Sequence, residues 1–163
     1  MKLAKYAILT IGLIAGAGFL MTGSTSHANS PKGPAIDPRL KMPADVALFV
    51  NRSCGDCHTN QPHLPWYGRV PPASWLLAED IAAAHKAVNF TQWGEKNGKS
   101  RGSAIATLSA ACVDLQSGRM PLPKYLWMHP AAKPQPGDVA RFCEWTHEEV
   151  ARLVRSKAHT PAK

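Results

Sequence analysis

The segment C-G-D-C-H at residues 54–58 constrains the chain more than any other feature of its sequence. Cys54 and Cys57 are three positions apart, and His58 follows the second cysteine directly. Cysteines at this spacing can hold zinc, form a redox pair or attach a group covalently. A zinc site usually has a second close pair of ligands, but the other two cysteines of the chain are far apart. A thioredoxin-like pair follows a strand, whereas the residues before Cys54 favour a helix.

The N-terminus has the three parts of a secretory signal peptide. Lys2 and Lys5 form a basic start, and residues 6–21 then carry no charge. A polar stretch ends in small residues that fit cleavage after Ala28. We therefore expect residues 1–28 to be removed and the protein to be periplasmic. The alternative is a retained membrane anchor, and we expect contact with a membrane only in that case.

Export favours the third interpretation of the motif, which is covalent attachment of a c-type haem. In such a site the two thiols add across the vinyl groups of the haem, and the histidine that follows becomes the proximal ligand of the iron. This attachment takes place outside the bacterial cytoplasm. The single motif predicts one covalent haem c on Cys54 and Cys57, with His58 as an iron ligand.

A methionine is the common second ligand in c-type cytochromes. Met120 lies in G-R-M-P, just after the expected end of a helix, and Pro121 restricts its backbone. We predict that Met120 is the sixth ligand. Met128 lies in a short aromatic segment and is expected to fill the core, and Met42 precedes the first helix. The alternative sixth ligands are the histidines at positions 63, 85, 129, 147 and 159. A further alternative is an iron whose sixth position is open.

Several further segments accompany the motif. They are T-N at residues 59–60, P-W-Y at 65–67, Pro71 and Pro72, Asp80 and Ile81, N-F-T at 89–91 with Trp93, and G-R-M-P at 118–121 with Tyr125. Through them, over roughly residues 45–146, the chain resembles the haem-binding domain family of bacterial monohaem c-type cytochromes. The resemblance implies an all-α, cytochrome c-like fold wrapped around the haem, with His58 and Met120 as axial ligands.

Four aromatic residues are candidates for contact with the haem. Trp66, Tyr67, Trp75 and Trp93 each combine an apolar ring with a polar group that could bond a propionate. We expect Trp66, Tyr67 and Trp93 to bind the cofactor. The alternative for each is ordinary packing in the core.

Apolar periodicity predicts four helices and hardly any strand. The helices are expected at residues 43–53, 72–87, 103–117 and 137–157, with Gly118 ending the third. In the second, Leu77, Ile81 and Ala84 form one apolar stripe. Residues 29–42 are rich in proline and are expected to be a flexible lead-in. One all-α domain is thus predicted over residues 43–157, followed by a tail at 158–163.

Two cysteines remain outside the motif. Cys112 and Cys143 lie on the apolar stripes of two expected helices and flank the segment of Met120. In an oxidising compartment spare cysteines usually pair, so we predict a disulfide between them. The alternative is two separate buried thiols.

Charge and ligand set together suggest a role. The formal net charge is +8, and it becomes +6 without residues 1–28, which contain Lys2 and Lys5 but no acidic residue. Export argues against a nucleic-acid partner. The positive charge then indicates either acidic redox partner proteins or an ordinary soluble surface of mixed charge. A His/Met-ligated iron has no open position, so we expect an electron carrier and no enzyme. We also expect the protein to be a monomer. The alternatives are a haem-based sensor in which Met120 is displaced, and a peroxidase that uses His63 or His85.

Overall fold

The structure, a computed structural model, describes residues 35–93 and 101–158. The expected signal peptide, the first six residues of the lead-in and nearly all of the tail lie outside these residues. The other eight residues of the lead-in, 35–42, are described, and they include a short helix whose Leu40 side chain is fully buried in the core. Every regular element in the described ranges is a helix, which confirms the all-α prediction. The order is η1 (Pro38–Leu40), α2 (Ala44–Ser53), α3 (Gly55–His58), η2 (Trp66–Arg69), α4 (Ala73–Ala87), α5 (Arg101–Gln116), α6 (Pro123–Met128), η4 (Pro130–Ala132) and α7 (Asp138–Ala158). None of the helices in these ranges has both the length and the apolar character needed to cross a membrane.

The four longest α-helices agree with the four expected from apolar periodicity. Pro43 precedes the first residue of α2 and serves as its N-cap. Gly118 follows α5 with a φ of +70°, a backbone conformation that glycine adopts without steric cost. Its N–H donates to the Leu115 carbonyl at 3.1 Å and thereby closes the last turn. The short helices α6 and η4 were not predicted, because proline-rich segments of this length carry little periodicity.

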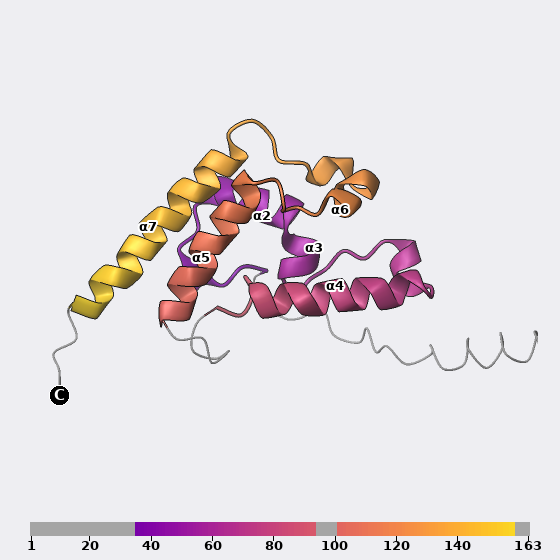
Figure 1. The fold of residues 1–163 in the computed structure, drawn as a ribbon, viewed down its shortest axis with the longest axis horizontal. Coiled ribbons are helices and arrows are strands. Elements are labelled where there is room, and N and C mark those ends of the chain that lie inside the picture. Colours follow the sequence, from indigo (N-terminus) through magenta and orange to yellow (C-terminus); the bar gives the residue numbers. More distant parts are fainter. Residues whose placement is uncertain (1–34, 94–100, 159–163) are drawn as a thin grey trace, which may run out of the picture. The chain divides into compact units, whose positions relative to one another are not determined.

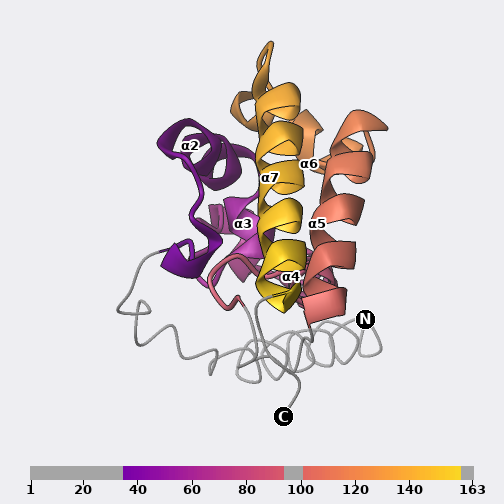
Figure 2. The same ribbon diagram turned by 90° about the vertical axis from the view of Figure 1, so that its left-hand side faces the viewer.

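The hydrophobic core lies where α2 and α5 pack against α7 (Figure 2). Val46, Phe49 and Val50 of α2 are buried together, as their shared helical face predicts. The Phe49 ring meets Phe142 of α7 edge-on, with 6.0 Å between the ring centroids. Burying three such side chains contributes several kcal/mol, at about 25 cal/mol per Å² of apolar surface. This packing gives α2 a fixed position, and α2 leads directly into the C-G-D-C-H motif.

A disulfide joins Cys112 of α5 to Cys143 of α7, which confirms the prediction. The sulfur atoms are 2.01 Å apart and the Cα atoms 5.1 Å apart. Both residues are buried, so the bond is part of the core between the two helices. It fixes α5 to α7 close to the end of α5, from which the segment of Met120 departs.

Helix α4 lies at the side of the core. The stripe of Leu77, Ile81 and Ala84 is only half-buried, and none of the 15 residues of α4 is buried. The main packing partners of α4 are α3 and η2 (Figure 1). Sequence periodicity shows that a helix has an apolar face, but it does not show what that face meets. Of this stripe, Ala84 lines a cavity together with Asp80, Ala83 and Ala87 on the adjoining side of α4, whereas Leu77 lies against η2.

Candidate functional site

The C-G-D-C-H motif folds as a helical turn at the end of α2. The N–H groups of Cys57 and His58 both donate to the Cys54 carbonyl, at 3.2 and 2.9 Å. Residues three and four positions apart lie on one side of such a turn. The two thiols and the imidazole therefore face the same region.

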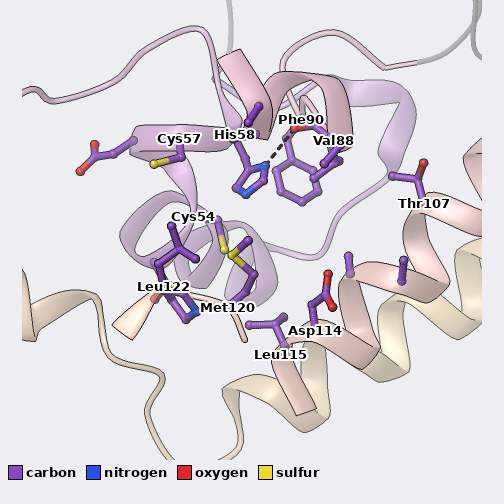
Figure 3. Close-up of a pocket in the computed structure, with 18 of the residues that line it drawn as sticks. Cys54, Cys57, His58, Val88, Phe90, Thr107, Asp114, Leu115, Met120 and Leu122 are labelled. Carbon is purple, nitrogen blue, oxygen red and sulfur yellow. Dashed lines mark hydrogen bonds between the residues drawn. The ribbon is translucent and has the colours of Figure 1, made fainter. Parts of the chain in front are cut away.

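That region is a cavity of about 570 Å³. Cys54, Cys57 and His58 line one part of its wall, and Met120 lines another. Figure 3 shows the His58 ring and the Met120 side chain entering the cavity from different sides, with the Cys54 sulfur between them in this view. The volume lies within the range of about 300–1,000 Å³ that is typical of ligand and cofactor sites.

Cys54 and Cys57 are free thiols, in contrast to the other cysteine pair. Burial raises the pKa of Cys54 to about 12. Burial also raises the pKa of Cys57, and the carboxylates of Asp56 and Asp80 act in the same direction. Both side chains are thus uncharged thiols in a mostly apolar wall, and they are available for a covalent bond.

The backbone of residues 88–90 orients His58. The Val88 carbonyl oxygen lies 2.9 Å from Nδ1 and can only accept, so Nδ1 carries the proton and Nε2 has a free lone pair. The Phe90 ring packs edge-on against the imidazole, with 6.2 Å between centroids. Burial, the largest effect, lowers the pKa of His58, which favours the neutral form that binds metals. The sequence flagged this segment only through the family resemblance.

A side-chain network joins residues 59–60, directly after the motif, to residues 89–91. Asn89 donates to the side-chain oxygen of Asn60 at 2.8 Å, and the Asn60 N–H donates to Thr91 Oγ1 at 2.9 Å. The Phe90 N–H also donates to the His58 carbonyl at 2.8 Å. The T-N and N-F-T segments of the sequence therefore serve as a brace behind the imidazole.

Met120 lies just beyond α5, in the turn that Gly118 begins. Its N–H donates to the Asp114 carbonyl at 3.1 Å, and the Arg119 guanidinium pairs with the Asp114 carboxylate at 2.6 Å. These contacts anchor the segment to α5. The half-buried Met120 side chain then lines the cavity, with Leu115 and Leu122 nearby (Figure 3).

The other candidate sixth ligands that the structure describes do not line this cavity. Met42 packs against the hydrophobic core instead. The expectation that Met128 fills the core is wrong, because its side chain is 54% exposed at the end of α6. The histidines at positions 63, 85, 129 and 147 lie outside the cavity wall. His159 lies outside the described residues.

Small side chains create the space. Two facing walls of the cavity carry three alanines each, at positions 83, 84 and 87 of α4 and at positions 106, 110 and 111 of α5. Larger residues at these positions would fill the space between the two helices. The spacing of alanines along both helices was a signal in the sequence, but only the fold shows that they face a common cavity.

Helix α6 lines another part of the cavity, next to the motif. The Tyr125 hydroxyl donates to Asp56 Oδ2 at 2.8 Å, and Lys124 pairs with Asp80 of α4 at 2.8 Å. Burial, and next the hydrogen bond to Asp56, raises the pKa of Tyr125 well above its usual range. Tyr125 lines the cavity and is a site residue whose role the sequence did not reveal.

The aromatic residues expected to contact a haem lie elsewhere. Trp66 is 79% exposed on η2, and Trp75 is exposed on α4. The Tyr67 hydroxyl bonds His129 Nε2 at 3.3 Å, away from the cavity wall. Trp93 is buried in the core, and its backbone N–H donates to the Asp37 carboxylate at 3.2 Å. The structure places none of these four in the cavity, whose aromatic wall consists of Phe90, Tyr125 and Phe142.

The chemistry of this site fits a covalently held haem. A flat apolar ring system needs an apolar cavity, two vinyl groups need two free thiols, and an iron needs neutral donors such as imidazole and thioether. The cavity wall supplies all three. It also contains the buried hydroxyl of Ser53, which has no hydrogen-bond partner among the described residues. An unpaired polar atom at this place suits a cavity that receives a ligand or a water.

Comparison with known proteins agrees with this chemistry. The model of the family described as "Haem-binding domain" matches residues 13–148, which is most of the chain. Searches of curated proteins and of solved structures found no match. Haem is thus the cofactor that both the cavity and the family indicate. The chain belongs to the haem-binding domain family.

Proposed function

We propose that this protein is a periplasmic monohaem c-type cytochrome that carries single electrons. One observation carries the proposal. Among the described histidines and methionines, only His58 and Met120 line the cavity, and they do so beside two free thiols. This arrangement provides two neutral axial ligands and two attachment points for one haem.

Each residue has a distinct task in this proposal. Cys54 and Cys57 would hold the haem as thioethers, each by addition of its S–H across one vinyl C=C bond, with sulfur going to one carbon and hydrogen to the other. His58 would hold the iron through Nε2, because Nδ1 is engaged by the Val88 carbonyl. Met120 would supply a thioether sulfur as the second protein ligand, a donor that stabilises Fe(II). Haem held in this way supplies a one-electron Fe(III)/Fe(II) couple.

The cavity wall supports electron transfer better than bond-making chemistry. A peroxidase needs an open iron and an acid-base group above it. His63 and His85, the candidates for that group, lie outside the cavity wall, and the His63 side chain is 96% exposed. The carboxylates of Asp80 and Asp114 at the cavity are already paired with Lys124 and Arg119.

The oxidising compartment is part of the proposal. The Cys112–Cys143 disulfide supports it, because such bonds persist outside the cytoplasm. Attachment to Cys54 and Cys57 then explains why the two thiols of the motif do not form a second disulfide. The mass of the denatured protein should exceed that of its apo chain by one haem. Extraction of the haem by acidified acetone would contradict the thioether bonds.

Coordination is tested with Met120→Ala, with Met128→Ala as the matched control. We expect Met120→Ala to abolish the near-infrared sulfur-to-iron charge-transfer band, to admit carbon monoxide to the reduced iron and to lower the reduction potential. Met128→Ala should leave all three unchanged, because its side chain lies outside the cavity. Absence of the band in the unmodified protein would refute methionine ligation. Displacement of Met120 by micromolar carbon monoxide or nitric oxide would instead favour a sensor.

A further inference from the structure

We propose that Tyr125 is a positioning residue that holds Met120 in place for ligation through its hydrogen bond to Asp56. This inference rests on the proposed His/Met coordination. It assigns a task to the one contact described above that links the attachment motif directly to α6 (Figure 1).

The acceptor of this hydrogen bond is rigid. Asp56 lies inside the C-G-D-C-H turn, two residues before His58, and its Oδ1 already accepts the His63 N–H at 2.9 Å. Its Oδ2 accepts the Tyr125 hydroxyl at 2.8 Å. The bond therefore ties the segment of one axial ligand to the segment of the other.

The donor is also held in a defined orientation. The Tyr125 ring stacks on the His129 imidazole, with 4.2 Å between centroids and 14° between planes. His129 Nδ1 lies 3.1 Å from the Tyr125 carbonyl, and Nε2 lies 3.3 Å from the Tyr67 hydroxyl. The carbonyl can only accept, so Nδ1 donates to it, and the Tyr67 hydroxyl bonds the other ring nitrogen. This stack directs the Tyr125 hydroxyl towards Asp56.

Met120 lies between two anchors along the chain. On its N-terminal side, its own N–H is bonded to the Asp114 carbonyl of α5. On its C-terminal side, the first side chain bonded to the attachment motif is that of Tyr125. Pro121 and Pro123 stiffen the connection between Met120 and Tyr125. Without the Asp56 bond, the C-terminal end of this short segment keeps the exposed ion pair of Lys124 with Asp80 but loses its link to the attachment motif. The sulfur then loses part of its fixed position.

The bond is strong enough to matter for ligand exchange. A phenol that donates to a carboxylate forms a charge-assisted bond, roughly twice as strong as a neutral one. Bonds to charged groups typically contribute enough to change an equilibrium about tenfold or more. The part-buried setting of Tyr125 and Asp56 reduces screening by solvent. We therefore expect its loss to weaken Met120 ligation about tenfold.

The test is Tyr125→Phe in the oxidised holoprotein, with imidazole as the competing ligand. Phenylalanine keeps the ring and its stack on His129, so the fold should be retained. Loss of the charge-transfer band on titration measures the displacement of Met120. We expect half-displacement at about one tenth of the imidazole concentration that the unmodified protein requires. The control is Ser156→Ala, which also removes one hydroxyl oxygen but at an exposed position of α7 outside the cavity wall, and it should shift the titration less than twofold.

A double-mutant cycle shows whether Tyr125 acts through Asp56. On the Asp56→Ala background, Tyr125→Phe should have no further effect on the titration, because the bond is already absent. Additive effects of the two substitutions would overturn the proposal, as would a Tyr125→Phe titration equal to that of the unmodified protein. If the unmodified protein lacks the charge-transfer band, His/Met coordination itself fails, and the two failures are thereby distinguished.

Discussion

The Nδ1 atom of His58 lies 2.9 Å from the carbonyl oxygen of Val88, 30 residues further along the chain. A backbone acceptor at this place selects one imidazole tautomer and directs the other nitrogen into the cavity. Phe90, two residues after Val88, packs against the same imidazole and is 2% exposed. The precise position of the His58 imidazole thus depends on residues 88–90, which lie outside the C-G-D-C-H motif.

Phe90→Ala should lower the free energy of unfolding by about 3–5 kcal/mol, because it leaves a void against the imidazole. Chemical denaturation of the holoprotein measures this. Phe90→Leu keeps most of the volume and should cost less than about 1.5 kcal/mol. A loss below about 1 kcal/mol for Phe90→Ala would show that residues 88–90 do not support His58.

Ala84→Leu should reduce the haem content of the protein while leaving the fold intact. Ala84 lines the cavity, so leucine would occupy space that the cofactor needs. Leucine also suits a helix almost as well as alanine, so α4 should persist. The haem-to-protein ratio and the far-ultraviolet circular dichroism measure the two effects.

The matched control is Ala82→Leu, an exposed position of the same helix that does not line the cavity. Its haem content should equal that of the unmodified protein. Equal haem content in both variants would contradict the assignment of this cavity to the cofactor.

The parts of the fold and site that the sequence predicted depend on local chemistry. Apolar periodicity is enough to locate α7, and Gly118 is enough to locate the end of α5, since each signal lies within the element or next to it. The Cys112–Cys143 bond could be predicted because an oxidising compartment was expected and two cysteines remained outside the motif. The residues that line the cavity as expected, His58 and Met120 among them, lie in short motifs of their own.

The parts that the sequence did not predict depend on tertiary arrangement. Trp66 and Trp127 are large and apolar, yet they are 79% and 86% exposed, although the Trp66 ring meets that of Tyr67 edge-on. The role proposed for Tyr125 depends on its hydrogen bond to Asp56, which is 69 residues away in the sequence. Sequence patterns along one element carry no information about such distant pairs, so the aromatic wall of the cavity was assigned to other residues.

Replacement of both Cys112 and Cys143 by alanine should lower the free energy of unfolding by about 3–4 kcal/mol. The two residues are 31 positions apart. Without the bond the unfolded chain gains conformational entropy, and for a loop of this length that entropy is equivalent to about 3–4 kcal/mol. Haem content should stay unchanged, because the thioethers use the other two cysteines. Alkylation of the denatured, unreduced protein should modify neither Cys112 nor Cys143. Labelling of both would contradict the disulfide.

Acid should remove a specific contribution of Asp37 to stability. The Arg39 side chain, the largest cause, lowers the pKa of Asp37 to about 2, and the N–H groups of Arg39 and Trp93 add to this. A lowered carboxyl pKa stabilises the fold above the unfolded value of about 3.9, and this stability is lost as the pH falls towards 2. Because Arg39 is about half exposed, we expect a contribution of about 1–2 kcal/mol.

Asp37→Asn should therefore lose about 1–2 kcal/mol of stability at neutral pH, and its unfolding free energy should fall less steeply than normal between pH 4 and pH 2. Denaturant titrations across this range measure the slope. The control is Asp45→Asn, whose carboxyl pairs with Arg141 in an exposed setting and should change stability less than Asp37→Asn does. Parallel pH profiles for Asp37→Asn and the unmodified protein would contradict the assigned role of Asp37.

Electron exchange with a negatively charged reagent should become slower as salt is added. Residues 29–163 carry a formal charge of +6, and two haem propionates would leave about +4. The Debye length falls from about 30 Å at 0.01 M salt to about 10 Å at 0.1 M, so attraction at a distance is largely screened. Stopped-flow oxidation of the reduced protein by hexacyanoferrate(III) measures this dependence. A cationic cobalt(III) oxidant is the matched control, and its rate should rise with salt because repulsion is screened. A rate with hexacyanoferrate that does not change with salt would show that the positive charge lies away from the site of electron exchange, and it would contradict steering of acidic partners by this charge.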